Sequence, residues 1–218
     1  MITLFDYELS SDCYQARLAL AVLGLHYSRV DVEFYPGREH ETEWFTELSP
    51  LQQLPVLRDE HTTLYDAQAI LVYLAARHDA TGTWLPRRDP VLVGEVTQWL
   101  GLSRALASSA GAARLHESLG HVTDVTAARA RAHTLLRTLD EHLWFGEQEG
   151  RSWLCAADHP TIADLAVFPD VALSEEGGVS RIDYPAVRRW TDRVKRIDGF
   201  VPRSGLFPGG SAAAPWPR

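Results

Sequence analysis

The stretch ITLFDYELSSDCYQARLALAVLGL, residues 2–25, combines a short strand with the start of a helix. Its first five residues, ITLFD, have the composition of a strand, and residues 13–25 carry apolar side chains at helical spacing. Gly24 is the expected end of this helix. The Ser-x-x-Cys that joins them, Ser10 to Cys13, has three interpretations. It is the remnant of a redox pair, a hydroxyl site that activates the thiol of another molecule, or a helix cap.

The bulk composition is that of an ordinary globular protein and argues against several classes of partner. The 218 residues provide for one large or two small domains, and 45% of them are hydrophobic. The net charge of −8 and the lack of a Lys/Arg run argue against nucleic acid. No apolar run approaches the roughly 20 residues that a membrane-spanning helix needs, so we expect no membrane partner.

The cysteines and histidines indicate the compartment and argue against a metal. Cys13 and Cys155 are the only two cysteines and lie far apart, which favours a reduced, cytoplasmic protein over a disulfide framework. The N-terminus MITLFDYEL has no basic segment followed by a long apolar one, so no signal peptide is expected. The nine histidines form no HExxH motif, and no CxxC motif is present, so we expect no metal site.

Local periodicity predicts a small α/β domain over residues 1–78. Residues 27–34 alternate as a half-buried strand does, and a short helix is expected near 41–48. LPVLRD and TTLY form two further strands around a turn, and Asp66 precedes a clear helix, AQAILVYLAARH. Strands and helices in this order indicate a sheet of mixed direction.

The pattern after residue 78 is that of a linker and an all-helical domain. Residues 79–89 are rich in Gly, Pro and charge, which is typical of a linker. A helical domain follows over 90–202, and 203–218 are expected to be a frayed tail. Its first helix carries two apolar stripes, so we expect burial on both sides. The predicted helices span 91–114, 124–145, 161–174 and 185–197.

Three motifs have both a structural and a functional interpretation. Pro55 is either an ordinary proline at the start of a strand or part of a cis bond that leaves the Leu54 backbone free to pair with an extended ligand. Asp66 either caps its helix or helps to hold the charged end of a ligand. Thr161 and Asp164 match a capping box, and for them we expect a structural role.

In their order and spacing, five segments resemble cytosolic glutathione transferases over about residues 1–202. The similarity is greatest to the bacterial, theta/zeta-like serine-type classes. It implies a thioredoxin-like α/β N-terminal domain joined to an all-α C-terminal domain. The segments are YELSSDCYQARLALAVLGL, SPLQQLPVL, LYDAQAILVYLA, PTIADLAVFPDVAL and DYPAVRRWTDRVKRIDGF.

This resemblance implies that Ser10 donates a hydrogen bond to the sulfur of bound glutathione. The positive end of the following helix then favours the thiolate, which attacks the second substrate. Ser11 has the same chemistry and is an alternative, as is a mixed disulfide at Cys13. A buried cysteine is more often a small apolar residue than a reactive thiol.

By the same resemblance, glutathione is the co-substrate, and six residues on three segments bind it. One difference weakens the match, because the family commonly has Glu-Ser where this chain has Asp66-Ala67. The lost hydroxyl removes a hydrogen bond to the γ-glutamyl carboxylate, at a cost of about 1.5–3 kcal/mol. Another small thiol is therefore an alternative ligand. The predicted glutathione residues are His40, Gln53, Leu54, Pro55, Asp66 and Ala67, with Arg38 as a weaker candidate.

A hydrophobic electrophile is expected between the domains, against the first long helix. Trp99, Ser103 and Leu106 lie on the stripe that we orient toward it, with Leu102 and Phe207 as lesser candidates. Conjugation in a cytoplasmic, homodimeric detoxification enzyme is the implied function, with isomerisation or dehalogenation as variants. The alternatives are a non-catalytic member that binds a thiol or a protein, and a disulfide reductase or peroxidase that acts through Cys13.

Overall fold

A computed structural model describes residues 1–203 of the chain, and its N-terminal part is built on a four-stranded sheet. The strands lie in the order β2-β1-β3-β4. β1 pairs parallel with β2 and antiparallel with β3, which pairs antiparallel with β4. This mixed sheet confirms the predicted α/β class. The strands are β1 (Ile2–Asp6), β2 (Tyr27–Asp31), β3 (Val56–Arg58) and β4 (Thr63–Leu64).

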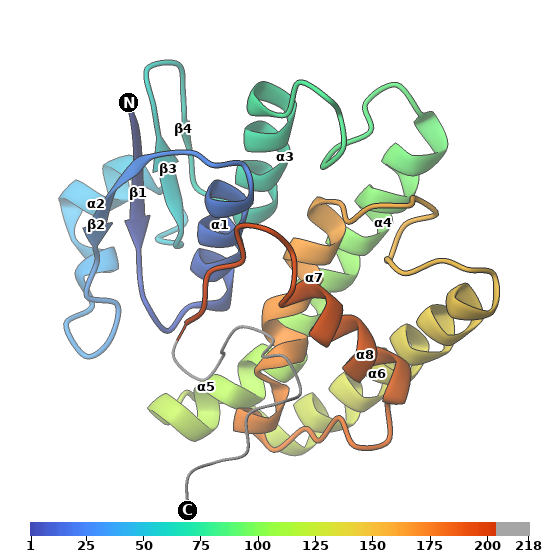
Figure 1. Cartoon of the computed structure of the whole chain (residues 1–218). Helices are drawn as coiled ribbons and strands as arrows, with labels where there is room; N and C mark the ends of the chain where they lie inside the picture. Colours follow the sequence, from blue (N-terminus) through green and yellow to red (C-terminus); the bar gives the residue numbers. More distant parts are fainter. Residues whose placement is uncertain (204–218) are drawn as a thin grey trace, which may run out of the picture.

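Successive side chains of β1 and β3 point to opposite faces of the sheet, and both faces are covered by helices. Leu4 and Leu57 are buried in the large core together with residues of α1 and α3. Phe5 and Val56 point the other way and are buried in a small cluster that includes Phe45 of α2. Figure 1 shows α1 and α3 on one side of the sheet. These elements are α1 (Ser11–Val22), the short helix η1 (Glu39–Glu41), α2 (Glu43–Leu48) and α3 (Ala67–His78).

The C-terminal part is helical within the described residues, as predicted, but its first helix differs from the prediction. The expected single helix over 91–114 is α4, which passes through a π-helical turn, η2, into α5. The turn has the small-residue sequence ASSAG, which allows a wider backbone. The elements are α4 (Pro90–Leu106), η2 (Ala107–Gly111), α5 (Ala112–Leu119), α6 (Val125–Gln148), α7 (Ile162–Ala172), η3 (Ser174–Gly177) and α8 (Pro185–Val194).

The helix α7 is the centre of the molecule, and every one of its residues is buried. Its capping box is present as predicted, because the Thr161 amide donates to Oδ2 of Asp164 at 2.9 Å. Asp164 Oδ1 also accepts from the indole of Trp190 at 2.8 Å, so this carboxylate is structural. No helix in the described part of the chain is both long and apolar enough to cross a membrane.

The segment that follows α8 returns to the N-terminal part. In Figure 1 it runs from α8 back to the side of α1. The Tyr14 hydroxyl of α1 donates to the carbonyl of Val201 at 2.7 Å. Phe200 packs edge-on against Phe168 of α7, with ring centroids 5.8 Å apart. Arg203, the last described residue, is buried and lies over the ring of Tyr14. The other residues of the predicted tail, and Phe207 among them, lie outside the described range.

Candidate functional site

A cavity of about 430 Å³ lies where the two parts of the chain meet. The N-terminal part contributes the start of α1, the loop before β3 and the start of α3. The helical part contributes the end of α4, the π-helical turn and α5. The cavity is within the size range of small-molecule sites.

Ser10 is at the N-terminus of α1 and lines this cavity. Its backbone is extended, and its Oγ accepts a hydrogen bond from the amide of Cys13 at 3.2 Å. The cap predicted for the Ser-x-x-Cys is therefore present. Because capping uses a lone pair of the hydroxyl oxygen, the hydroxyl hydrogen stays available for a ligand. Ser11 and Asp12 follow in the first turn and line the same cavity.

Cys13 does not line the cavity, and its surroundings argue against the alternative in which it is a reactive thiol. Its side chain is fully buried, and its sulfur accepts a hydrogen bond from the amide of Tyr7 at 3.3 Å. Burial raises the pKa of the Cys13 thiol far above its usual range, which disfavours the thiolate. Burial also raises the pKa of Cys155, to about 12. Both cysteines are packing residues.

The start of α3 presents a mixed-charge cluster to the cavity. Asp66 caps the helix, with Oδ1 accepting from the amide of Ala69 at 2.9 Å. Its other oxygen, Oδ2, forms an ion pair with Nη2 of Arg104 on α4 at 2.6 Å. Nε of Arg104 also donates to the Gln68 side chain at 2.8 Å. The sequence prediction missed Arg104, although this residue is the one basic side chain in α4.

The remaining predicted thiol-binding residues also gather at the cavity, with two exceptions. Gln53 and Leu54 line it, and Leu54 lies outside the sheet ladder, which begins at Val56. The Leu54–Pro55 bond is cis, as one of the two interpretations expects, and Pro55 is buried behind the cavity lining. Arg38 is the other exception, since it pairs with Glu41 on the surface and does not line the cavity.

His40 lines the cavity and is more buried than an ordinary loop histidine. Its ring stacks on Phe34 with the centroids 4.0 Å apart, and Phe34 lines the cavity as well. Burial lowers the pKa of His40, which favours the neutral ring. Its Nδ1 is buried and has no hydrogen-bond partner within residues 1–203. This atom is therefore available to a ligand.

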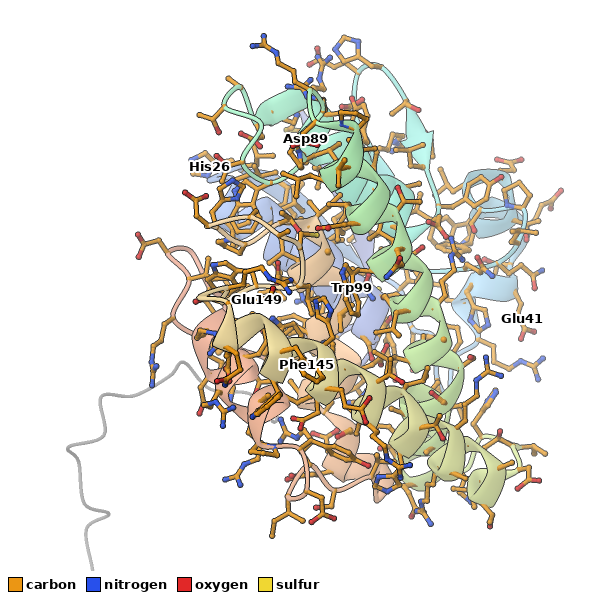
Figure 2. The ribbon with its side chains drawn as sticks, turned by 90° about the vertical axis from the view of Figure 1, so that its right-hand side faces the viewer. His26, Glu41, Asp89, Trp99, Phe145 and Glu149 are labelled. Carbon is orange, nitrogen blue, oxygen red and sulfur yellow. The ribbon has the colours of Figure 1, made fainter. Side chains whose placement is uncertain are left out.

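The predicted electrophile residues do not line the cavity, because α4 turns a neighbouring face toward it, which carries Arg104 and leads to Ala107. Trp99 and Leu106 are buried in the helical core, and Ser103 donates to the carbonyl of Ala166 on α7 at 2.9 Å. The ring centroid of Trp99 lies 4.6 Å from that of His142 on α6, and Figure 2 shows Trp99 between α4 and α6. Leu102 packs against the same core. The residues that do line this side are Arg104, Ala107, Gly111, Arg114 and Leu115.

Two carboxyl groups of the cavity lining were also missed from the sequence. Burial raises the pKa of Asp12 to about 7, and the nearby charges of Asp170 and Asp66 act in the same direction. Asp170 comes from α7, is 2% exposed, and has no hydrogen-bond partner for either carboxyl oxygen among the described residues. The cavity thus contains two acids in surroundings that favour their neutral forms.

Comparison with known proteins gives consistent matches over both parts of the chain. Residues 1–76 match the family model "Glutathione S-transferase, N-terminal domain", and residues 110–193 match "Glutathione S-transferase, C-terminal domain". Glutathione S-transferase verG of Clonostachys rogersoniana is 26% identical over 182 residues, covering 78% of this chain and 74% of its own. Maleylacetoacetate isomerase of Pseudomonas aeruginosa is 26% identical over 211 residues, covering 90% of this chain and 92% of its own.

A solved structure extends this likeness to the whole fold. The crystal structure of a glutathione S-transferase from Pseudomonas fluorescens superimposes with a TM-score of 0.82 at 26% identity. The superposition covers 92% of this chain and 98% of the other.

Proposed function

Because the chain belongs to the glutathione S-transferase family, we propose that it binds glutathione in this cavity and activates its thiol for attack on an electrophile. One observation carries the proposal. The hydroxyl of Ser10 lies at the positive end of α1 and lines the same cavity as Gln53, Leu54 and Asp66. These groups have the chemistry needed to hold a peptide-like thiol with its sulfur at the start of a helix.

In this proposal Ser10 lowers the pKa of the thiol without forming a covalent intermediate. Its hydroxyl donates a hydrogen bond to the glutathione sulfur, and the first-turn amides of α1 add the positive end of the helix dipole. Both interactions favour the thiolate over the thiol, and the thiolate is the nucleophile. Proximity within the cavity then brings the sulfur to the electrophile.

The rest of glutathione is assigned by matching its groups to the cavity lining. The main chain of Leu54 pairs with the cysteinyl unit of glutathione as an added strand would, and Gln53 binds beside it. His40 holds the glycine end of glutathione. Asp66 meets the γ-glutamyl ammonium, and the amide of Ala67 meets the γ-glutamyl carboxylate.

Arg104 compensates for the hydroxyl that is missing at Ala67. Its guanidinium lines the cavity next to Asp66, and its contacts with Asp66 and Gln68 use two of its five N–H groups. The remaining donors are available to the γ-glutamyl carboxylate. Asp66 and Arg104 together form a cradle for an α-amino acid zwitterion, with one charge for each of its ends.

Finer assignments follow from the family resemblance. We infer a serine-type mechanism like that of the theta/zeta-like classes, conjugation of a hydrophobic electrophile, a homodimer, and a cytoplasmic role in detoxification. The disulfide reductase alternative needs a reactive Cys13, which the burial of this thiol argues against. A non-catalytic thiol-binding protein is the remaining alternative, and Ala67 is the residue that favours it.

Two measurements test the proposed function. Isothermal titration with glutathione measures binding, and turnover with glutathione and a nitroaryl chloride measures conjugation. We expect saturable binding and release of chloride. Binding without turnover would favour the non-catalytic alternative. Absence of binding would overturn the proposal.

A further inference from the structure

Asp170 is a buried acid that packing alone does not explain. Its side chain comes from α7 and lines the cavity that also contains Ser10, yet neither of its carboxyl oxygens has a hydrogen-bond partner among residues 1–203. Gly111 leaves room for it, because a Cβ at that position would lie 2.9 Å from Oδ1 of Asp170. A buried carboxyl group without partners is costly, so its presence beside a ligand cavity suggests that a ligand supplies the partner.

The two arginines nearest to Asp170 in its electrostatic surroundings form no ion pair with it. Arg114 of α5 donates to the carbonyl of Leu9 at 2.8 Å and pairs with Glu176 of η3 at 2.5 Å. Arg203 approaches the carbonyl of Ser10 at 3.5 Å, and burial lowers its own pKa to about 10. Neither arginine therefore forms an ion pair with Asp170.

These surroundings favour the protonated form of the Asp170 carboxyl group. Burial raises its pKa, and this outweighs the opposite effects of the nearby Ser11 hydroxyl and of the positive charges of Arg114 and Arg203. Asp12 on α1 lies in the same cavity, and the like charge of either acid disfavours ionisation of the other. A protonated carboxyl is a hydrogen-bond and proton donor.

We propose that Asp170 is the proton donor to the electrophile in reactions where sulfur attack places negative charge on an oxygen, as with α,β-unsaturated ketones. This inference rests on the proposed function, because glutathione bound at Ser10 supplies the nucleophile. The apolar side chains of Leu9, Ala107 and Leu115 line the same cavity and suit the carbon skeleton of such a compound.

The reaction step balances without a further reactant. The thiolate forms a C–S bond at the β-carbon of the enone, and the electrons of the C=C bond move to form an enolate. The enolate oxygen takes the proton of Asp170, which leaves an enol and a carboxylate. The glutathione thiol released its proton to solvent on ionising, and solvent returns one proton to the carboxylate. The enol then tautomerises to the ketone.

Paired substrates separate this role from a structural one. In an aryl chloride bearing nitro groups, chloride leaves and no oxygen has to be protonated, so a proton donor contributes nothing to that reaction. Asp170→Asn keeps the size of the side chain but removes the acidic proton. We expect kcat/KM with phenylbutenone, an α,β-unsaturated ketone, to fall by about 10²-fold, the lower end of what general acids contribute. The value with the aryl chloride should stay within about twofold.

The control is Asp158→Asn, which changes a side chain that is 97% exposed and should alter neither rate. An equal loss with both substrates would overturn the proposal in favour of a packing role, and no loss with the enone would overturn it as well. If the wild-type protein does not bind glutathione, the proposed function itself fails.

A second measurement does not depend on how the variant folds. With wild-type protein the ratio of enone to aryl chloride turnover should fall as the pH rises through the pKa of Asp170, because ionisation removes the donor while the thiolate is shared by both reactions. A ratio that is independent of pH would overturn the proposal.

Discussion

Arg104 lies with its Nη2 atom 2.6 Å from Oδ2 of Asp66, which joins α4 of the helical part to the first turn of α3 at the edge of the cavity. The Arg104 side chain is 62% exposed, and ion pairs this exposed contribute about 0–1 kcal/mol to stability. Holding the two parts of the chain together is therefore a minor effect of this pair. Its larger effect is to place one positive and one negative group beside the free amides of a helix N-terminus.

Arg104→Gln should weaken glutathione binding about tenfold. The substitution removes the positive charge that we assign to the γ-glutamyl carboxylate, and one charge-assisted hydrogen bond is worth about 1.5 kcal/mol. Titration calorimetry with glutathione measures the change in Kd. Thermal unfolding of the same variant should shift little.

An analogue of glutathione that lacks the γ-glutamyl α-carboxylate completes a thermodynamic cycle of two proteins and two ligands. It should bind wild-type protein and Arg104→Gln with similar affinity, because the group that Arg104 contacts is gone. Arg131→Gln on the exposed side of α6 is the control and should bind glutathione as the wild type does. If Arg104→Gln weakens both ligands equally, the arginine acts on the shape of the site and not on that carboxylate.

Ser10→Ala should reduce turnover by an order of magnitude or more while leaving the Kd for glutathione largely intact. The hydroxyl is assigned to the sulfur alone, and one hydrogen bond to a charged group is worth about 1.5–3 kcal/mol. The same substitution removes the cap of α1 and should cost about 1 kcal/mol of unfolding free energy. Initial rates under glutathione saturation, together with thermal unfolding, measure both effects.

Ser10→Thr separates the two effects, because it keeps a capping hydroxyl and a donor. We expect stability near that of the wild type and most of the turnover. Ser11→Ala is the matched variant, because Ser11 is the alternative residue for activating the thiol. A large loss of turnover in Ser11→Ala with little loss in Ser10→Ala would transfer the role to Ser11.

Local sequence patterns predicted the α/β part and the helical part of the chain, and the family resemblance pointed to several residues that the structure brings to one cavity. The helix over 67–78 is observed with the predicted bounds, and the capping box at Thr161 is present, because both depend on side chains a few residues apart. Ser10, Asp66 and Ala67 lie at helix N-termini, and a cap is a local property of the chain. All three residues line one cavity.

What the sequence did not show depends on the rotation and packing of distant helices. Neither apolar stripe of α4 faces the cavity, and Trp99 proved to be core. Periodicity predicts which residues are apolar together, but not that the helix turns its Arg104 side toward the cavity. The π-helical turn then changes the phase of the helix before Gly111. Arg104 and Asp170 reach the site from α4 and α7, far along the chain from Asp66 and Ser10, so no local pattern associated them with it.

Cys13→Ala should leave conjugation within about twofold of the wild-type rate, because the thiol lies on the buried side of α1 and has no role in the proposed chemistry. Iodoacetamide labelling followed by mass spectrometry gives an independent measure. Neither cysteine should be alkylated in the folded protein, and both should be in denaturant. Rapid labelling of Cys13 in the native protein, or loss of turnover in Cys13→Ala, would restore the thiol-based alternative.

Asp12 should make the protein less stable as the pH rises through neutrality. Its pKa is raised from 3.8 to about 7 in the fold, so the folded state holds this proton more tightly than the unfolded state. The stabilisation is fully present below about pH 3.8 and is lost as the pH rises through about 7. A shift of this size in a fully buried group is worth about 4 kcal/mol, and partial exposure of the side chain reduces it to roughly 1–2 kcal/mol.

Asp12→Asn removes that titration while keeping an oxygen that accepts from Gln15, as Oδ1 of Asp12 does at 3.1 Å. Urea unfolding at about pH 4 and about pH 8 should therefore show a smaller loss of unfolding free energy in the variant than in the wild type. Asp164 and Asp170 also have raised pKa values and are present in both proteins, so the difference reports the titration of Asp12 together with its coupling to Asp170. Asp158→Asn, at an exposed position, should retain the wild-type pH dependence. If the unfolding free energy changed equally with pH in the wild type and in Asp12→Asn, the Asp12 carboxyl would be solvated and ionised in the fold. The cavity would then be more open to water than its lining indicates.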